Sequence, residues 1–137
     1  MGVIIDTCIW IDIERGSIAP ADVQRYTGKA PVFISPVSIA ELTFGLEIAK
    51  GPAIRQKRTA ALERLKKKPV LIIDEDTGII FGRLAAELRR SGRGPDFRIQ
   101  DLWIASQAIQ NGYSVLTTNG KDFLDIPGLD LLIFGKE

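Results

Sequence analysis

Histidine is absent from the sequence, and cysteine occurs once, at Cys8. This inventory excludes zinc sites built from His and Cys, a His general base, and Ser-His or Cys-His nucleophile pairs. A single cysteine also excludes an internal disulfide, and its position among apolar residues predicts a small core side chain. Any catalytic chemistry must therefore come from carboxylates, hydroxyls, lysines or arginines.

The sequence also lacks a long apolar run and a strong excess of one charge. No stretch is long enough to cross a bilayer and no cleavable leader is visible, so we expect a soluble cytoplasmic protein without a membrane partner. The formal net charge is +1, so a polyanionic partner would have to be bound by a local basic patch. With 137 residues, 45% of them hydrophobic, the chain is predicted to form a single domain over residues 1–137.

Short apolar runs alternate with helical patterns along the whole chain. Strands are expected at residues 3–5, 32–34, 69–73, 114–117 and 131–134, and helices at about 7–13, 19–26, 36–50, 53–68, 78–90 and 99–109. This alternation predicts an α/β fold, a three-layer α/β/α sandwich around a mainly parallel five-stranded sheet. In the helix at 36–50, the spacing of Val37, Phe44 and Ile48 predicts an inward face that also carries Glu41.

Asp6 directly follows the first predicted strand. The carboxyl ends of parallel strands open onto the crevice where ligands bind in α/β sheets. Asp is also a favoured helix N-cap, and a short helix that ends at Gly16 follows it. Taken alone, Asp6 is explained equally well by a cap and by a role in a site.

Two further acids, Glu41 and Asp101, lie on predicted inward faces, although ionised carboxylates are rarely buried without a partner. If the first and fourth strands end at the same sheet edge, both acids converge on Asp6. Asn119 and Asp122, which follow the fourth strand, would complete the cluster.

Such a cluster of like charges requires a cation. All-oxygen ligation favours a hard divalent ion such as Mg²⁺ or Mn²⁺. The alternative is that Glu41 and Asp101 each pair with an arginine, such as Arg83 or Arg98.

Four blocks of the sequence carry a family resemblance: residues 4–11, 38–42, 101–105 and 116–123. In this order, and over nearly the full length, they resemble the PIN-domain ribonucleases, and among these the VapC toxins of toxin–antitoxin pairs. One departure is Gln100, which stands where the family often has Asn. The resemblance implies a PIN-like fold and a Mg²⁺-dependent endoribonuclease, with Mn²⁺ able to substitute.

The resemblance also assigns residues and partners. It implies that Asp6, Glu41, Asp101 and Asp122 are the catalytic, metal-binding acids, supported by Thr7, Thr117 and Asn119. The expected partners are an RNA substrate, a small cognate antitoxin and a second copy of the chain in a homodimer. We expect the RNA backbone to be contacted by the basic residues Arg93, Arg98 and Lys121.

Two other functions remain open from the sequence. A phosphoacceptor receiver domain would use Asp6, Asp74 and Thr117, but it needs a lysine after its fifth strand, where only Lys136 is available. It also leaves Glu41 and Asp101 unexplained, and Asp74 is better interpreted as a helix cap. A PIN scaffold without catalytic activity is the other alternative.

Overall fold

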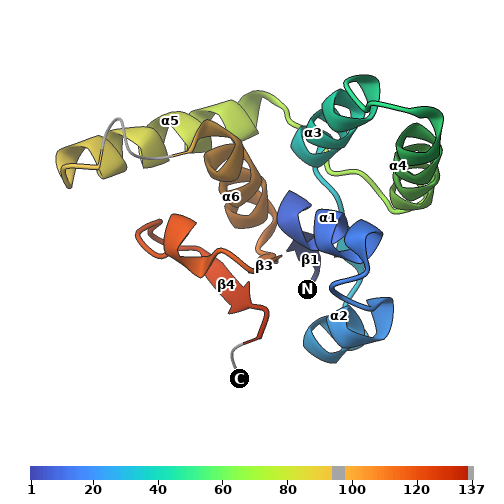
Figure 1. Cartoon of the computed structure of the whole chain (residues 1–137). Coiled ribbons are helices and arrows are strands. Elements are labelled where there is room, and N and C mark those ends of the chain that lie inside the picture. The colour runs from blue at the N-terminus through green and yellow to red at the C-terminus, as the bar shows by residue number, and fades with distance from the viewer. Residues whose placement is uncertain (94–97, 136–137) are drawn as a thin grey trace.

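The fold is described from a computed structural model, which covers residues 1–93 and 98–135 (Figure 1). Residues 94–97, which connect two of the predicted helices, therefore lie outside the described residues, as does Lys136. The sheet contains β1 (Val3–Ile5), β2 (Val32–Phe33), β3 (Ser114–Thr117) and β4 (Asp130–Ile133). Its order is β2-β1-β3-β4, and all three pairings are parallel.

Helices cover both faces of this sheet. They are α1 (Thr7–Arg15), α2 (Pro20–Thr27), α3 (Pro36–Glu47), α4 (Pro52–Leu65), α5 (Glu75–Arg90) and α6 (Ile99–Asn111), with a 3₁₀ turn, η2 (Gly120–Asp122). Alternate residues of β1 point to opposite faces: Ile4 packs with α5 and α6, whereas Val3 and Ile5 pack with α1 and α2. The predicted parallel three-layer α/β fold is confirmed.

The predicted strand at 69–73 is wrong, so the described sheet has four strands rather than five. This segment forms only a single parallel bridge, between Val70 and Ile34. Pro69 has no N–H to donate, and the carbonyl oxygen of Leu71 accepts a hydrogen bond from the Gln107 side chain amide at 2.8 Å instead of from a neighbouring strand. Because Val70 and Ile72 are exposed, the segment has too little buried surface to extend the pairing.

The predicted inward face of α3 is also wrong in part. Phe44 and Ile48 are exposed, with 66% and 59% of their surface accessible. The core side of α3 is instead formed by Ile39, Leu42 and Leu46, which pack against buried residues of α4. Apolar residues lie all around this helix, so their spacing did not identify the buried face.

The start of α5 follows the expected capping chemistry. Asp74 is its N-cap and accepts a hydrogen bond from the Thr77 N–H, while Glu75 and Asp76 lie in the first turn. Leu84 and Leu88 are buried as predicted, whereas Ile79 is exposed. No helix in the described ranges is both long enough and apolar enough to span a bilayer.

Candidate functional site

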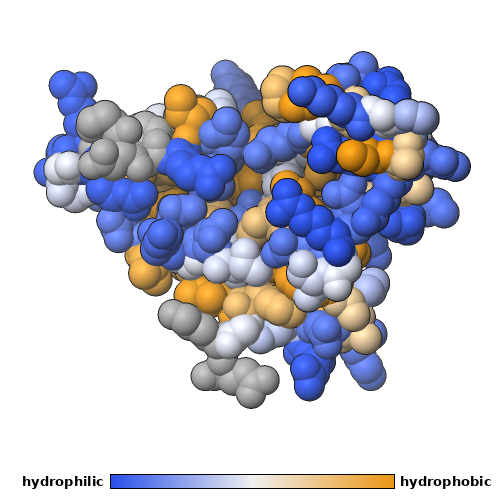
Figure 2. Space-filling model, in the orientation of Figure 1, coloured by the Kyte–Doolittle hydropathy of each residue, from blue (hydrophilic) through white to orange (hydrophobic). Residues whose placement is uncertain are grey.

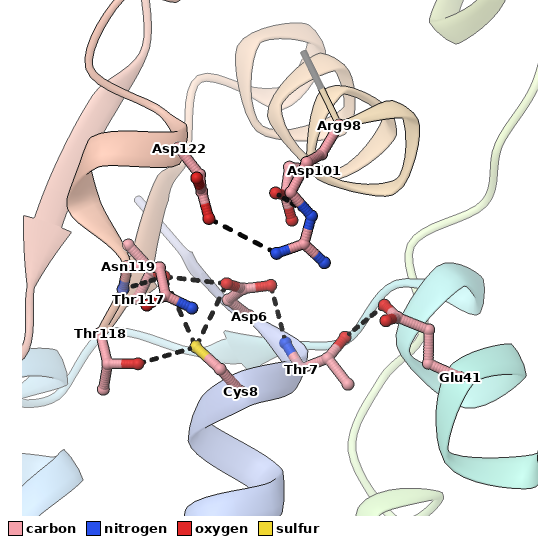
Figure 3. A network of polar contacts seen from close by, with 10 residues as sticks. All are labelled: Asp6, Thr7, Cys8, Glu41, Arg98, Asp101, Thr117, Thr118, Asn119 and Asp122. Atoms are coloured by element: carbon pink, nitrogen blue, oxygen red, sulfur yellow. Dashed lines mark hydrogen bonds and ion pairs between the residues drawn. The ribbon is translucent and has the colours of Figure 1, made fainter. Parts of the chain in front are cut away.

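Asp6 lies at the centre of a polar network where β1 passes into α1 (Figure 3). It is the N-cap of α1, and its Oδ1 accepts a hydrogen bond from the Thr7 N–H at 2.8 Å. Its Oδ2 accepts one from the Thr117 hydroxyl at 2.8 Å, at the end of the neighbouring strand β3. The side chain is therefore both a cap and a fixed member of the site, and a carboxylate held in this way has little freedom to turn.

Glu41 joins this network through the hydroxyl of Thr7. The Thr7 Oγ1 donates to Glu41 Oε1 at 2.9 Å and lies 2.8 Å from the Ser38 hydroxyl. Thr7 and Ser38 are buried, whereas Glu41 is half-buried, which corrects its predicted place on a core face. Thr7 was predicted to support the acids, and it contacts Glu41 directly. Ser38 is a further residue of this network that did not stand out in the sequence.

Asp101 is the most perturbed acid of the site. It lies in the first turn of α6, and only 7% of its side chain surface is exposed. Burial, reinforced by the negative charges of Asp6, Asp122 and Glu41, raises the pKa of Asp101 to about 7, although Arg98 acts in the opposite direction. Asp6, Asp122 and Glu41 are therefore all close enough to Asp101 to act on it electrostatically.

Arg98 is the cation of the site. Its Nε lies 3.2 Å from Asp101 Oδ2, and its Nη1 donates to Asp122 Oδ2 at 3.4 Å. Asp101 Oδ2 is nevertheless left without a partner in hydrogen-bond geometry, so the contact with Nε is an ion pair at close range and not a directed bond. Of the two arginines considered as partners for the buried acids, Arg98 is the one that pairs with Asp101.

The remaining predicted residues lie at different distances from this centre. Asp122 ends η2, is half-buried and faces Asp101 across the Arg98 guanidinium (Figure 3). Asn119 contributes through its backbone, since its N–H donates to the Thr117 hydroxyl at 3.0 Å. Lys121 is exposed, whereas Arg93 pairs with Asp125 at 3.2 Å and is only 20% exposed.

Cys8 is a site residue that the sequence interpretation placed in the core. Its thiol is half-buried and donates to Asp6 Oδ2 at 3.3 Å, while the Thr118 hydroxyl lies 3.1 Å from its sulfur. Burial and the negative charge of Asp6 raise the pKa of the Cys8 thiol, so it stays protonated and acts as a donor at neutral pH. Its position two residues after Asp6 was the only available signal for this role.

The donor set fits a hard divalent cation in its chemistry. It offers carboxylate oxygens from Asp6, Glu41, Asp101 and Asp122, and the buried Oδ2 of Asp101 lacks a hydrogen-bond partner. Within residues 1–93 and 98–135, no three such side chains converge closely enough to hold an ion as they stand. A bound ion would therefore have to draw the carboxylates inward.

Comparison with known proteins places this chain in a family. The PIN domain model matches residues 3–129. Ribonuclease VapC1 of Rickettsia felis is 35% identical over 96% of each chain. The crystal structure of VapBC-5 from Mycobacterium tuberculosis superimposes with a TM-score of 0.77 and 30% identity, over 98% of each chain.

A further solved structure supports the fold alone. VapBC2 of Rickettsia felis, bound to a promoter DNA fragment, has a TM-score of 0.84 at 23% identity and covers 98% of this chain and 99% of that chain. The receiver alternative is overturned, because the family match covers almost the whole chain and Asp74 caps α5. The chain belongs to the PIN-domain family and, within it, to the VapC ribonucleases of toxin–antitoxin systems.

Proposed function

We propose that this chain is a Mg²⁺-dependent endoribonuclease, the toxin of a toxin–antitoxin module, whose metal is held by Asp6, Asp101, Asp122 and Glu41. VapC nucleases of the PIN-domain family depend on a metal ion. The observation that carries the proposal here is the buried Asp101 carboxylate, which has an unsatisfied Oδ2 and three other acids around it. Mn²⁺, which has similar oxygen preferences, is expected to substitute.

The chain's own residues divide the work of phosphodiester hydrolysis. When bound, the metal supplies an activated water and offsets the negative charge that develops on the phosphate. Asp6 is held in place by the Thr7 N–H and the Thr117 hydroxyl, so it would offer a bound ion a carboxylate of fixed orientation. Glu41 and Asp122 are half-buried and are the two candidates to accept the proton of the attacking water.

RNA is proposed to approach over the open side of the acid site. Lys121 is exposed one residue before Asp122, and the side chain of Arg98 is half exposed, so both can contact phosphates near the scissile bond. Arg93 is less suited to this role, because it is largely buried in its ion pair with Asp125. Phosphate contacts of this kind fix position without reading sequence.

An antitoxin is proposed as the protein partner, because VapBC-5 and the other similar structures are VapBC toxin–antitoxin complexes. A pocket of about 400 Å³ between α1, α3 and α4 reaches Glu41, with apolar walls that include Trp10, Leu42 and Leu62. Its lining also includes Arg15, Arg64 and Lys68, together with Arg58, which pairs with Glu14 at 3.8 Å and donates to the Gly45 carbonyl. In Figure 2, hydrophobic and hydrophilic residues lie side by side over the α3–α4 end of the molecule. An apolar segment flanked by acidic residues would fit this pocket.

The chain is further proposed to form a homodimer.

The metal requirement is the direct test of the proposed activity. Purified protein should cleave RNA internally in the presence of Mg²⁺ or Mn²⁺, lose this activity in excess EDTA, and regain it when Mg²⁺ is added back, because no side chain of the site offers a metal-free route. The measurement is the appearance of internal cleavage products of a labelled RNA. Undiminished cleavage in the chelator would refute the metal-dependent mechanism.

A further inference from the structure

Arg98 occupies a position that its own helix does not favour. It is the N-cap of α6, and its side chain makes no capping hydrogen bond. Ser, Thr, Asp and Asn are the preferred caps, and a positive charge is unfavourable near a helix N-terminus because of the helix dipole. A residue that breaks a local rule in this way has its compensation elsewhere in the structure.

The compensation is found in the acid site. The guanidinium lies between carboxylates from two different elements, Asp101 of α6 and Asp122 of η2, and Figure 3 shows it facing the space that they share. It therefore provides the positive charge that the acid cluster needs when no other cation is bound. Among the residues that the structure describes, these acids do not converge into a set of three or more that could hold an ion.

The same contacts are weak enough to be exchanged. The two distances are 3.2 and 3.4 Å, they go to different carboxylates instead of forming a bidentate pair, and 50% of the arginine side chain is exposed. Ion pairs with this exposure contribute little, and a long side chain held by them can move into solvent without unfolding its helix. A divalent ion carries more charge in less space and binds carboxylate oxygens directly.

We infer that Arg98 is a built-in counter-ion of the metal site: it neutralises Asp101 and Asp122 in the metal-free protein, and an arriving divalent ion displaces it. This inference rests on the proposed metal-dependent function, and it makes Arg98 a competitor of the metal for Asp101 and Asp122. Metal affinity is then set partly by the cost of releasing Arg98. The displaced guanidinium, still tethered beside the site, becomes available to an RNA phosphate.

Replacing Arg98 by glutamine separates the two effects. At pH 8, metal-free Arg98→Gln should melt a few degrees below the parent, roughly 2–5 °C, because the acids lose their counter-charge. Its affinity for Mn²⁺, measured by calorimetric titration, should be higher by about threefold to tenfold, because no arginine has to be displaced. Arg98→Lys keeps the positive charge, so its melting temperature and its Mn²⁺ affinity should lie between those of the parent and those of Arg98→Gln.

The control is Arg90→Gln, which removes an exposed arginine paired with Glu87 on α5, away from the acids. It should bind Mn²⁺ with the affinity of the parent. If Arg98→Gln and Arg98→Lys bind Mn²⁺ no more tightly than the parent, Arg98 does not compete with the metal, although the metal-dependent nuclease would stand. If neither the parent nor either variant binds Mn²⁺, the proposed metal site is refuted, and the role of Arg98 with it. Should Arg98→Gln not fold, the comparison of Arg98→Lys with the parent decides.

Discussion

At the scale of single residues, Asp101 carries the conflict between stability and function. Its carboxylate is almost fully buried, lies among like charges, and keeps one oxygen without a hydrogen bond. Each of these conditions favours the neutral acid in a metal-free protein, and a bound cation would offset their effect by stabilising the ionised carboxylate. Asp101 therefore destabilises the metal-free fold but is well suited to bind a divalent ion, as expected for the proposed metal ligand.

The raised pKa of Asp101 predicts a pH dependence with a definite sign. Between its ordinary value of 3.8 and its folded value of about 7, the unfolded chain releases this proton while the folded chain retains it. The contribution to stability is therefore fully present below about pH 4 and is lost as the pH rises to about 7. Asp101→Asn should lack this loss, so metal-free Asp101→Asn should melt about 3–10 °C above the parent at pH 8, with a smaller difference at pH 5.

Thermal melts of both metal-free proteins over this pH range provide the measurement. Asp76→Asn serves as a control, because Asp76 lies exposed in the first turn of α5. A large loss of stability in metal-free Asp101→Asn at pH 8 would identify Asp101 as a structural carboxylate that depends on its ion pair with Arg98. In that case Asp101 would stabilise the fold through its ion pair and would not be expected to bind a metal ion.

At the scale of elements, the strand ends and helix starts determine which side chains meet. β1 and β3 are parallel neighbours, and the Asp6 N–H donates to the Leu116 carbonyl at 3.0 Å, so Asp6 and Thr117 necessarily lie side by side. The sequence was sufficient for this part, because apolar runs followed by a polar residue fix both the strand and its end. It was insufficient for residues 69–73, whose strand-like pattern is overridden by exposure and by Pro69.

Lys121 in η2 and Arg93 after α5 are expected to differ in their effect on RNA binding. Lys121 is exposed beside Asp122, whereas Arg93 is occupied by Asp125. Lys121→Gln should weaken RNA binding and reduce the slope of log K against log salt by about one, since one phosphate contact is lost. Arg93→Gln should lower the melting temperature and leave that slope unchanged.

Filter binding with a labelled RNA at several salt concentrations tests this difference. Metal-free protein in EDTA avoids cleavage during the measurement. An unchanged slope for Lys121→Gln would show that this lysine is a solvated surface residue. A reduced slope for Arg93→Gln would show that its pair with Asp125 opens to admit RNA.

At the scale of the whole molecule, the site is assembled from segments far apart in the chain. Asp6 and Thr117 are hydrogen-bonded across 111 positions, and α3 brings Glu41 to Thr7 from 34 positions away. Asp101 could be nominated from sequence because a carboxylate on an apolar helical face is unusual, and Asp6 and Asp122 because they follow buried strands. The roles of Cys8 and Ser38 could not, because small polar residues are common in cores and their contacts depend on tertiary packing.

The exchange between arginine and metal likewise belongs to the assembled molecule. From sequence, a metal and an arginine were alternative partners for Asp101. The structure shows the arginine in contact with the acid, in a geometry that leaves Asp101 Oδ2 unsatisfied. The two alternatives are therefore compatible as successive states of one site.

We propose that these acids form the catalytic centre of a ribonuclease. The most direct test of this proposal is internal cleavage of a labelled RNA in saturating Mg²⁺ by the parent protein, by Asp101→Asn and by Asp76→Asn, each shown by circular dichroism to be folded. We predict that Asp101→Asn reduces the cleavage rate by at least about a hundredfold, because a metal ligand and its charge are lost, while Asp76→Asn cleaves like the parent. Cleavage by folded Asp101→Asn at the parent rate would contradict the claim.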